Sequence, residues 1–70
     1  MSIVVYGKPE CPECDRTKKE LDKRKIKYNY IDLADEANVS DLKLIKSMGY
    51  KSVPVIFEDG EAVSLGYLIN

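Results

Sequence analysis

The chain contains two cysteines, Cys11 and Cys14, which lie three residues apart in the stretch KPECPECD. Two thiols at this spacing can form a permanent disulfide, contribute half of a metal site, or act as a dithiol that exchanges with other disulfides. These three uses require different surroundings, so the rest of the chain decides between them.

A permanent disulfide would add little to this protein. Closing so short a loop stabilises a fold by only about 2 kcal/mol in the chain-entropy view. The apolar run at residues 1–6 is too short for a signal peptide or a membrane span, and no longer run follows. We therefore expect a cytoplasmic protein, whose thiols are kept reduced unless a reaction oxidises them.

A metal site is also disfavoured. A structural zinc site needs four ligands, and the chain offers two cysteines and no histidine. A dimer could gather four cysteines around zinc or an iron-sulfur cluster, but nothing in the sequence specifies that dimer. We expect a monomer with no bound metal, and keep the metal-carrying dimer and an inert cysteine pair as alternatives.

Composition indicates one ordinary globular domain over residues 1–70. The chain is 44% hydrophobic and 33% charged, and its net charge of -1 gives no overall basic character. A local group of cations is interrupted by Glu20 and Asp22, which is typical of a solvated helix face; its members are Lys18, Lys19, Lys23, Arg24, Lys25 and Lys27. We expect neither a nucleic acid nor a membrane as a partner.

The first half of the chain predicts a strand, a helix and a second strand around the cysteines. Residues 3–6 are β-formers bounded by Gly7 and Pro9, and residues 28–33 form a second such run. A helix from Pro12 to about residue 25 has acids in its first turn and cations in its last. Such a unit makes the two strands parallel, with a right-handed crossover.

The second half predicts another helix and a hairpin. Residues 35–38 form a polar link, and Asn38 or Ser40 could cap the next helix, which ends at Gly49. The apolar face of this helix comprises Leu42, Leu44, Ile45 and Met48. Asp59-Gly60 between residues 53–57 and 62–65 is a hairpin signal. The resulting order, β-α-β-α-β-β, gives an α/β domain with a four-stranded mixed sheet.

The two cysteines occupy unequal positions in this scheme. Cys11 falls at the start of the helix, where free backbone N–H groups, the helix dipole and the cation of Lys8 favour a thiolate. Cys14 lies one turn further and should be more buried. We therefore expect Cys11 to be the exposed nucleophile and Cys14 to be the resolving thiol that attacks Cys11.

A proline at the entrance of the third strand is a second unusual feature. Pro54 follows Val53 where a strand should begin, and proline is normally unwelcome there. A cis bond in a special turn would suit it, and the antiparallel return of this strand should make it face Cys11. The alternative is a trans proline that merely opens an edge strand.

Together these residues resemble the thioredoxin superfamily, and within it the glutaredoxins and the glutaredoxin-like NrdH redoxins. The matching residues are Val5-Tyr6-Gly7-Lys8-Pro9, the two cysteines, Thr17-Lys18-Lys19, Leu21-Asp22, Tyr28, Asp32, Gly49-Tyr50 and Val53-Pro54-Val55. The resemblance implies a thioredoxin-like fold whose C-terminal helix is truncated or absent. It also implies a dithiol-disulfide oxidoreductase in which cis-Pro54 helps to hold an extended segment of the partner, paired with Val53.

The resemblance implies that the protein binds no cofactor and receives its electrons from another molecule. NrdH redoxins receive them from NADPH through thioredoxin reductase and pass them to ribonucleotide reductase, whereas glutaredoxins use glutathione. Lys8 could meet a glutathione carboxylate, and Pro12 is the glutaredoxin-type choice. Residues 65–70, however, lack the acids that glutaredoxins offer to the glutathione ammonium.

NrdH redoxins commonly carry Trp-Ser-Gly-Phe where this chain has Ser64-Leu65-Gly66-Tyr67. The match retains a glycine and an aromatic residue, so Gly66 and Tyr67 are further candidate contacts for a partner. We therefore expect an NrdH-like reductant of protein disulfides, with a glutathione-dependent glutaredoxin as the alternative.

Overall fold

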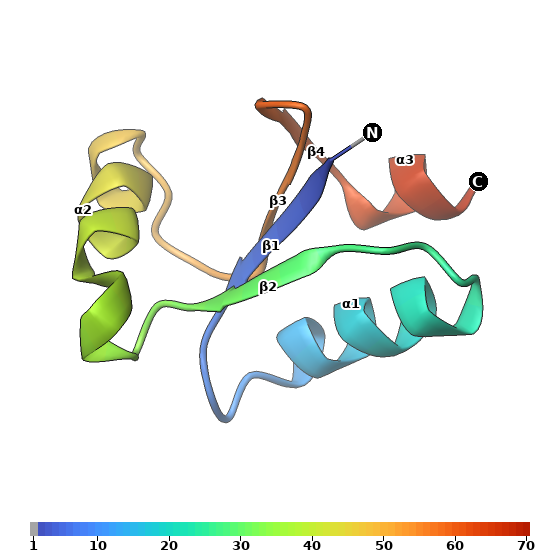
Figure 1. Ribbon diagram of the computed structural model, residues 1–70, viewed down its shortest axis with the longest axis horizontal. Helices are drawn as coiled ribbons and strands as arrows, with labels where there is room; N and C mark the ends of the chain where they lie inside the picture. The colour runs from blue at the N-terminus through green and yellow to red at the C-terminus, as the bar shows by residue number, and fades with distance from the viewer. Residues whose placement is uncertain (1) are drawn as a thin grey trace.

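A four-stranded sheet lies between helices on both of its faces (Figure 1). The computed structural model describes residues 2–70. In chain order its elements are β1 (Ile3–Gly7), α1 (Pro12–Lys23), β2 (Asn29–Asp32), the 3-10 helix η1 (Glu36–Asn38), α2 (Val39–Ser47), β3 (Val55–Glu58), β4 (Glu61–Val63) and α3 (Leu65–Ile69). This confirms the predicted order, with a short final helix. None of the helices in the described residues is long and apolar enough to cross a bilayer.

The strands run in the order β2-β1-β3-β4. β1 and β2 are parallel, with Gly7 opposite Asp32, while β3 is antiparallel to β1, with Tyr6 opposite Val55. β4 returns antiparallel to β3. The predicted parallel pair and hairpin are therefore confirmed, and the end of β1, where the cysteine stretch begins, lies beside the start of β3.

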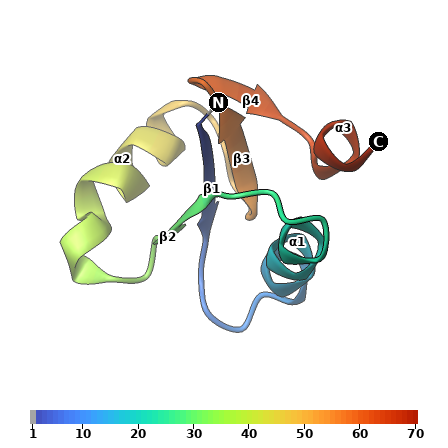
Figure 2. The same ribbon diagram turned by 45° about the vertical axis from the view of Figure 1, so that its right-hand side comes forward.

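The two faces of the sheet bury separate apolar clusters. In the turned view of Figure 2, α2 covers one face of the sheet, while α1 and α3 cover the other face. On the α1 side the buried cluster is Ile3, Val5, Leu21 and Ile56; on the α2 side it is Leu33, Ile45 and Val55. Each side chain of this kind contributes about 1.5 to 3 kcal/mol when fully buried. The alternation of β1 across the sheet places its odd residues under α1.

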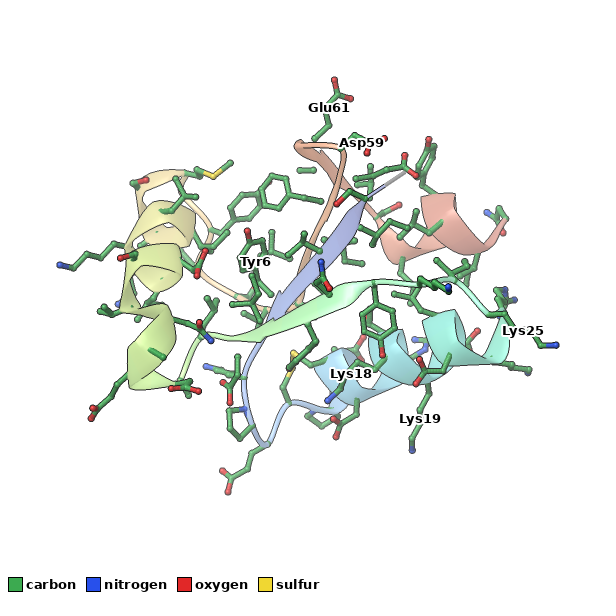
Figure 3. All side chains as sticks on the ribbon, viewed as in Figure 1. Tyr6, Lys18, Lys19, Lys25, Asp59 and Glu61 are labelled. Atoms are coloured by element: carbon green, nitrogen blue, oxygen red, sulfur yellow. A yellow bond between two sulfur atoms is a disulfide. The ribbon has the colours of Figure 1, made fainter. Side chains whose placement is uncertain are left out.

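Aromatic side chains fill the space between the sheet and α2. Tyr6 projects from β1 toward α2 (Figure 3) and meets Phe57 edge-to-face, with ring centroids 5.7 Å apart. Tyr50 packs against the same Phe57 ring at 6.4 Å. Such pairs contribute about 0.5 to 1.5 kcal/mol beyond their buried area. Tyr6 and Tyr50 thus contribute to packing between the sheet and α2.

Helix α1 packs against the sheet through a narrow face, whose buried residues are Cys14, Thr17 and Leu21. It ends at Lys23, two residues earlier than predicted. Lys25 adopts a left-handed conformation (φ 58°), and Ile26 N–H donates to the Leu21 carbonyl at 2.9 Å. This closing turn satisfies the last carbonyls and directs the chain toward β2.

Helix α2 differs from its prediction in two respects. Asn38 is its N-cap, but the Asn38 side-chain amide donates to the Asp32 carbonyl at 2.9 Å instead of capping the helix. Only Ile45 is fully buried, whereas Leu44 and Met48 are half exposed and line a 350 Å³ groove beside Tyr6. The end at Gly49, with φ of 92°, is as predicted.

In the last third of the chain, the turn forms where the sequence predicted it, but the bounds of the strands differ from the prediction. Asp59 and Gly60 both have positive φ, at 50° and 87°, and form the two-residue turn between β3 and β4. β3 begins at Val55 rather than 53, because Pro54 has no N–H to give to the sheet. Residues 64 and 65 were predicted as strand, but Ser64 caps α3 and accepts a hydrogen bond from Tyr67 N–H at 3.1 Å.

Candidate active site

Cys11 and Cys14 form a disulfide at the start of α1, visible as the yellow bond between sulfur atoms in Figure 3. Their Cα atoms are 5.2 Å apart, a separation at which a disulfide closes readily. The structure therefore shows the oxidised state of the pair. Opening this bond takes up two electrons and two protons and yields a dithiol.

Cys11 is the N-cap of α1, as the sequence predicted. Its backbone is extended (φ -120°, ψ 101°), and its Sγ accepts a hydrogen bond from Cys14 N–H at 3.1 Å. The Cys11 carbonyl accepts the first helical bond, from Asp15 N–H, at 3.1 Å. The sulfur thus stands at the positive end of the helix dipole, where a thiolate is stabilised.

The two cysteines differ in access: Cys14 is buried as expected, but Cys11 is more covered than expected. The exposed fraction is 0% for Cys14 and 9% for Cys11. Cys14 is the more buried residue, but Cys11 is much less open than an exposed nucleophile should be. The Val53 carbonyl oxygen lies 4.0 Å from Cys11 Sγ, so the segment before Pro54 covers much of the sulfur. A partner must approach the small part that remains accessible.

The Val53–Pro54 peptide bond is cis, as the sequence predicted. The short distance from the Val53 carbonyl to Cys11 Sγ places this segment against the disulfide. The alternative of a trans proline opening an edge strand is therefore wrong. A disulfide sulfur carries no proton, so the approach is a packing contact that fixes where the Val53 backbone lies.

A pocket of about 320 Å³ lies beside Val53 and gathers three lysines. Lys8 comes from the turn after β1, Lys46 from the last turn of α2, and Lys51 from the loop before Pro54. Grouped cations in a partly enclosed space attract an anion. Sequence reasoning identified Lys8 and missed Lys46 and Lys51, because only the packing of α2 brings them to this wall.

The structure does not bring the Tyr67 hydroxyl to the cysteines. This side chain is 61% exposed, and its hydroxyl donates to Glu58 Oε1 at 3.1 Å. Glu58 pairs with Ile3, at the end of β1 furthest from the cysteines. The same hydrogen bond raises the pKa of Tyr67. Gly66 lies in the first turn of α3, and the role of both residues as partner contacts stays a prediction.

Pro12 occupies the first position of α1 and is exposed beside Cys11. Thr17, one turn beyond Cys14, is buried, and its hydroxyl donates to the Glu13 carbonyl at 2.9 Å. This is the ordinary backward bond of a helical threonine, and it directs the hydroxyl to the backbone of α1.

Sequence reasoning missed a cluster beneath Cys14. A Cβ placed on Gly7 would lie 3.0 Å from Cys14 Sγ and 2.9 Å from Tyr30 Cζ, and would overlap the Tyr30 hydroxyl. The Lys18 ammonium stands over the Tyr30 ring, 4.2 Å from its centroid. The only sequence signal was a glycine at the end of a buried strand, where side chains of neighbouring elements can come close.

Glu13 lies between the two cysteines, and its negative charge should disfavour the thiolate form of Cys11. Glu10, Glu13 and Asp15 surround the helix start with negative charge, which opposes thiolate formation. We therefore expect Glu13→Gln to increase the alkylation rate of reduced Cys11 by iodoacetamide near neutral pH, by about twofold to threefold. Asp22→Asn, which removes an acid near the far end of α1, serves as the matched control. An unchanged or slower reaction of the Glu13 variant would contradict this account.

The sheet order, the cis peptide before β3 and the cysteine pair at the start of α1 define a thioredoxin-like fold that carries a closed dithiol pair. Residues 3–63 match the glutaredoxin family, and the chain belongs to that family. Its members are thiol-disulfide oxidoreductases, and the cysteine pair that this chemistry requires is present here.

Similar proteins come from both branches that the sequence suggested. The chain is 33% identical over 64 residues to a glutaredoxin of Ricinus communis, covering 89% of this chain and 63% of that protein. It is 34% identical over 62 residues to the glutaredoxin-like protein NrdH of Lactococcus lactis, covering 89% and 83%. The NrdH-redoxin of Escherichia coli has the same fold, with a TM-score of 0.81 at 20% identity, covering 91% and 82%. The chain thus spans less than two thirds of the Ricinus protein.

Proposed function

We propose that this protein reduces disulfides of other proteins by dithiol exchange. The observation that carries the proposal is the closed Cys11–Cys14 bond at the start of α1, with Cys14 fully buried and Cys11 slightly exposed beside the cis-Pro54 segment. Such a pair can store two electrons and deliver them to one disulfide at a time.

In the proposed reaction the reduced Cys11 attacks as a thiolate, stabilised by the Cys14 N–H and the helix start. It bonds to one sulfur of the partner disulfide, and the other partner sulfur leaves and takes up a proton. Cys14 then loses its proton and attacks Cys11 Sγ. The mixed disulfide breaks, the second partner thiol departs, and the Cys11–Cys14 bond closes. The partner has gained two electrons and two protons.

The partner should bind as an extended segment along residues 53 and 54. The Val53 carbonyl lies 4.0 Å from Cys11 Sγ, so a strand that pairs with Val53 would carry its own sulfur to the accessible side of Cys11. The neighbouring pocket with Lys8, Lys46 and Lys51 favours a partner that carries a carboxylate near its disulfide.

For the electron source we propose thioredoxin reductase, which draws on NADPH, with ribonucleotide reductase as a recipient. The identity to the Lactococcus NrdH protein over most of its length supports this choice. A second pocket beside Pro54, about 250 Å³ and bounded by Tyr50, Val63 and Ser64, has no charged residue among the described residues that line it. The first turn of α3 carries no acid. An ammonium group such as that of glutathione would find no carboxylate there, forgoing about 1.5 to 3 kcal/mol for each charged hydrogen bond.

One observation favours the alternative, a glutathione-dependent glutaredoxin. The same lysine-lined pocket beside Val53 could accept the glycine carboxylate of glutathione. The two candidates therefore share the anion pocket and differ at the ammonium end. In both, the working protein is a cytoplasmic monomer that holds no cofactor of its own.

The deciding experiment measures NADPH oxidation during reduction of insulin disulfides under two regenerating systems. One contains thioredoxin reductase alone, and the other contains glutathione with glutathione reductase. We expect turnover at least tenfold faster with thioredoxin reductase. Strong turnover with glutathione alone would overturn the NrdH-like choice and leave the glutaredoxin.

The Cys14→Ser variant sharpens this comparison. Thioredoxin reductase must restore a dithiol, so the variant should be inactive in that system, whereas a second glutathione molecule can resolve a mixed disulfide on Cys11 without Cys14.

Metal analysis and an absorption spectrum of the fresh protein test the third hypothesis, a metal-carrying dimer. Stoichiometric zinc or iron with loss of reductase activity would support that hypothesis against both redox functions.

A further inference from the structure

Beneath the first turn of α1, the Tyr30 hydroxyl and the Cys14 sulfur approach the same point in space. Each lies within 3.0 Å of the position that a Cβ on Gly7 would occupy. Tyr30 is on β2, opposite Val5, and its side chain runs under α1 toward the end of β1. Because residue 7 is glycine, this position places no side chain between the hydroxyl and the sulfur.

Cys14 needs a hydrogen-bond donor at two stages of dithiol exchange. It must carry negative charge when it attacks Cys11, and again when it leaves Cys11 as the disulfide is reduced. Its exposed fraction is 0%, so water cannot solvate that charge. Its own backbone N–H is already directed at Cys11 Sγ. A neighbouring side chain with a hydrogen-bond donor can meet this charge.

We propose that Tyr30 is a catalytic residue that donates its hydroxyl hydrogen bond to Cys14 Sγ whenever this sulfur is a thiolate, an inference that rests on the proposed dithiol chemistry. Tyr30 keeps its proton throughout. When Cys14 resolves a mixed disulfide, its own proton goes to the departing partner thiolate, the Cys14–Cys11 bond forms and the Cys11–partner bond breaks. When a reductant thiolate attacks Cys11, the same hydroxyl stabilises Cys14 as the leaving group.

The surroundings of Tyr30 keep the hydroxyl in its donor form. Burial, together with the nearby carboxylates of Asp32 and Asp15, raises the pKa of Tyr30. The Lys18 ammonium over the ring acts in the opposite direction, but the net shift is upward. Tyr30 therefore remains a phenol through the neutral range. The pKa of this hydroxyl is shifted by burial and by charges alone. Among the described residues, no hydrogen bond of the hydroxyl contributes to the shift, so the hydroxyl is free to donate to Cys14.

Lys18 has a second effect on the same hydrogen bond. A cation held 4.2 Å from a ring centroid draws electron density from the ring and so strengthens the hydroxyl as a donor. Figure 3 shows Lys18 on the side of α1 that faces β2. The groups that face Cys14 and Tyr30 are thus Lys18 and Asp15 from α1 and Asp32 from β2, while β1 contributes Gly7.

The test separates the two sulfur-exchange steps with a small aromatic disulfide, dithiobis(nitrobenzoate), whose halves are coloured when released. Reduced protein mixed with this reagent should release one half in a second-order phase, as Cys11 attacks. The second half should follow in a first-order phase, as Cys14 resolves the mixed disulfide. We expect Tyr30→Phe to slow the second phase about tenfold, which corresponds to one hydrogen bond to a charged group, and to leave the first unchanged.

Tyr28→Phe is the matched control, because Tyr28 precedes the same strand and its raised pKa arises chiefly from burial and from Asp22, with Tyr30 as the smallest cause. It should leave both phases unchanged. Equal second phases in the wild type and Tyr30→Phe would overturn the proposal. Equal slowing of both phases, accompanied by a lower melting temperature, would show a packing role only and would also overturn it.

A second readout is independent of turnover. In the Cys11→Ser background Cys14 is the only thiol, and its ionisation can be followed by the ultraviolet absorbance of the thiolate. Adding Tyr30→Phe should move that titration upward by about one pH unit, whereas Tyr28→Phe should not. Neither assay uses thioredoxin reductase or glutathione. A wild-type protein that never releases the second half would refute the dithiol function itself, and the Tyr30 role with it.

Discussion

Replacing Cys11 with serine is expected to abolish disulfide reduction, whereas Cys14→Ser should retain the first half of the reaction and accumulate mixed disulfides. Cys11 carries the accessible sulfur, so without it no bond to a partner can form. Without Cys14, nothing within the protein attacks that bond. Mass spectrometry of each variant after incubation with a disulfide-containing protein measures the trapped adduct, and insulin reduction measures the loss of turnover by at least a thousandfold.

Serine is a suitable replacement because it preserves the start of α1. The Cys11 side chain accepts a hydrogen bond from Cys14 N–H, and a serine hydroxyl at this position can do the same. Cys11→Ala would remove the cap as well, at a cost of about 1 kcal/mol. An unchanged melting temperature in Cys11→Ser would therefore attribute the loss of activity to the sulfur. Adducts that form on Cys14 in this variant would show that the two roles are reversed.

Gly7→Ala is expected to destabilise the protein by about 2 kcal/mol and lower its melting temperature by roughly 10 °C. The added methyl group would overlap the Tyr30 hydroxyl and press on Tyr30 Cζ and Cys14 Sγ. The effect is large for a domain of this size, whose total stability is only about 3 to 5 kcal/mol. Urea unfolding followed by circular dichroism measures it.

The cause of that loss can be checked with two further variants. A Cβ on Gly66 would meet only Ser64 Oγ, at 3.9 Å, so Gly66→Ala should leave stability unchanged or raise it slightly. On a Tyr30→Leu background the ring and hydroxyl are absent, and Gly7→Ala should cost at least 1 kcal/mol less than in the wild type. Equal costs on the two backgrounds would mean that the contact with Tyr30 is not the source of the effect.

The order of the elements could be predicted because each boundary is signalled by a particular residue. Pro12 opens α1, Gly49 ends α2, and Asp59-Gly60 makes the hairpin turn, and each of these takes the backbone form that its type favours. One error falls where a polar residue had two possible uses. Ser64 was read as part of a strand, although its hydroxyl could equally cap a helix, as it does for α3.

The candidate site was predictable to the extent that it is local in sequence. The spacing of the cysteines and the position of Cys11 at the helix start follow from neighbouring residues. The covering of Cys11 by Val53 and the meeting of Tyr30 with Cys14 depend on how β2 and β3 align with β1. A shift of one residue in either register would turn those side chains to the other face of the sheet. Such contacts require the folded arrangement.

The hydrogen bond from Cys14 N–H to Cys11 Sγ has a further consequence for how this protein can be observed. The amide proton of Cys14 points at the atom whose charge and bonding change at every step of the proposed cycle. Its magnetic resonance frequency should therefore differ between the disulfide, the thiolate and a mixed disulfide. One backbone nucleus, present in the unmodified chain, thus serves as an internal indicator of the redox state, with no dye or label attached.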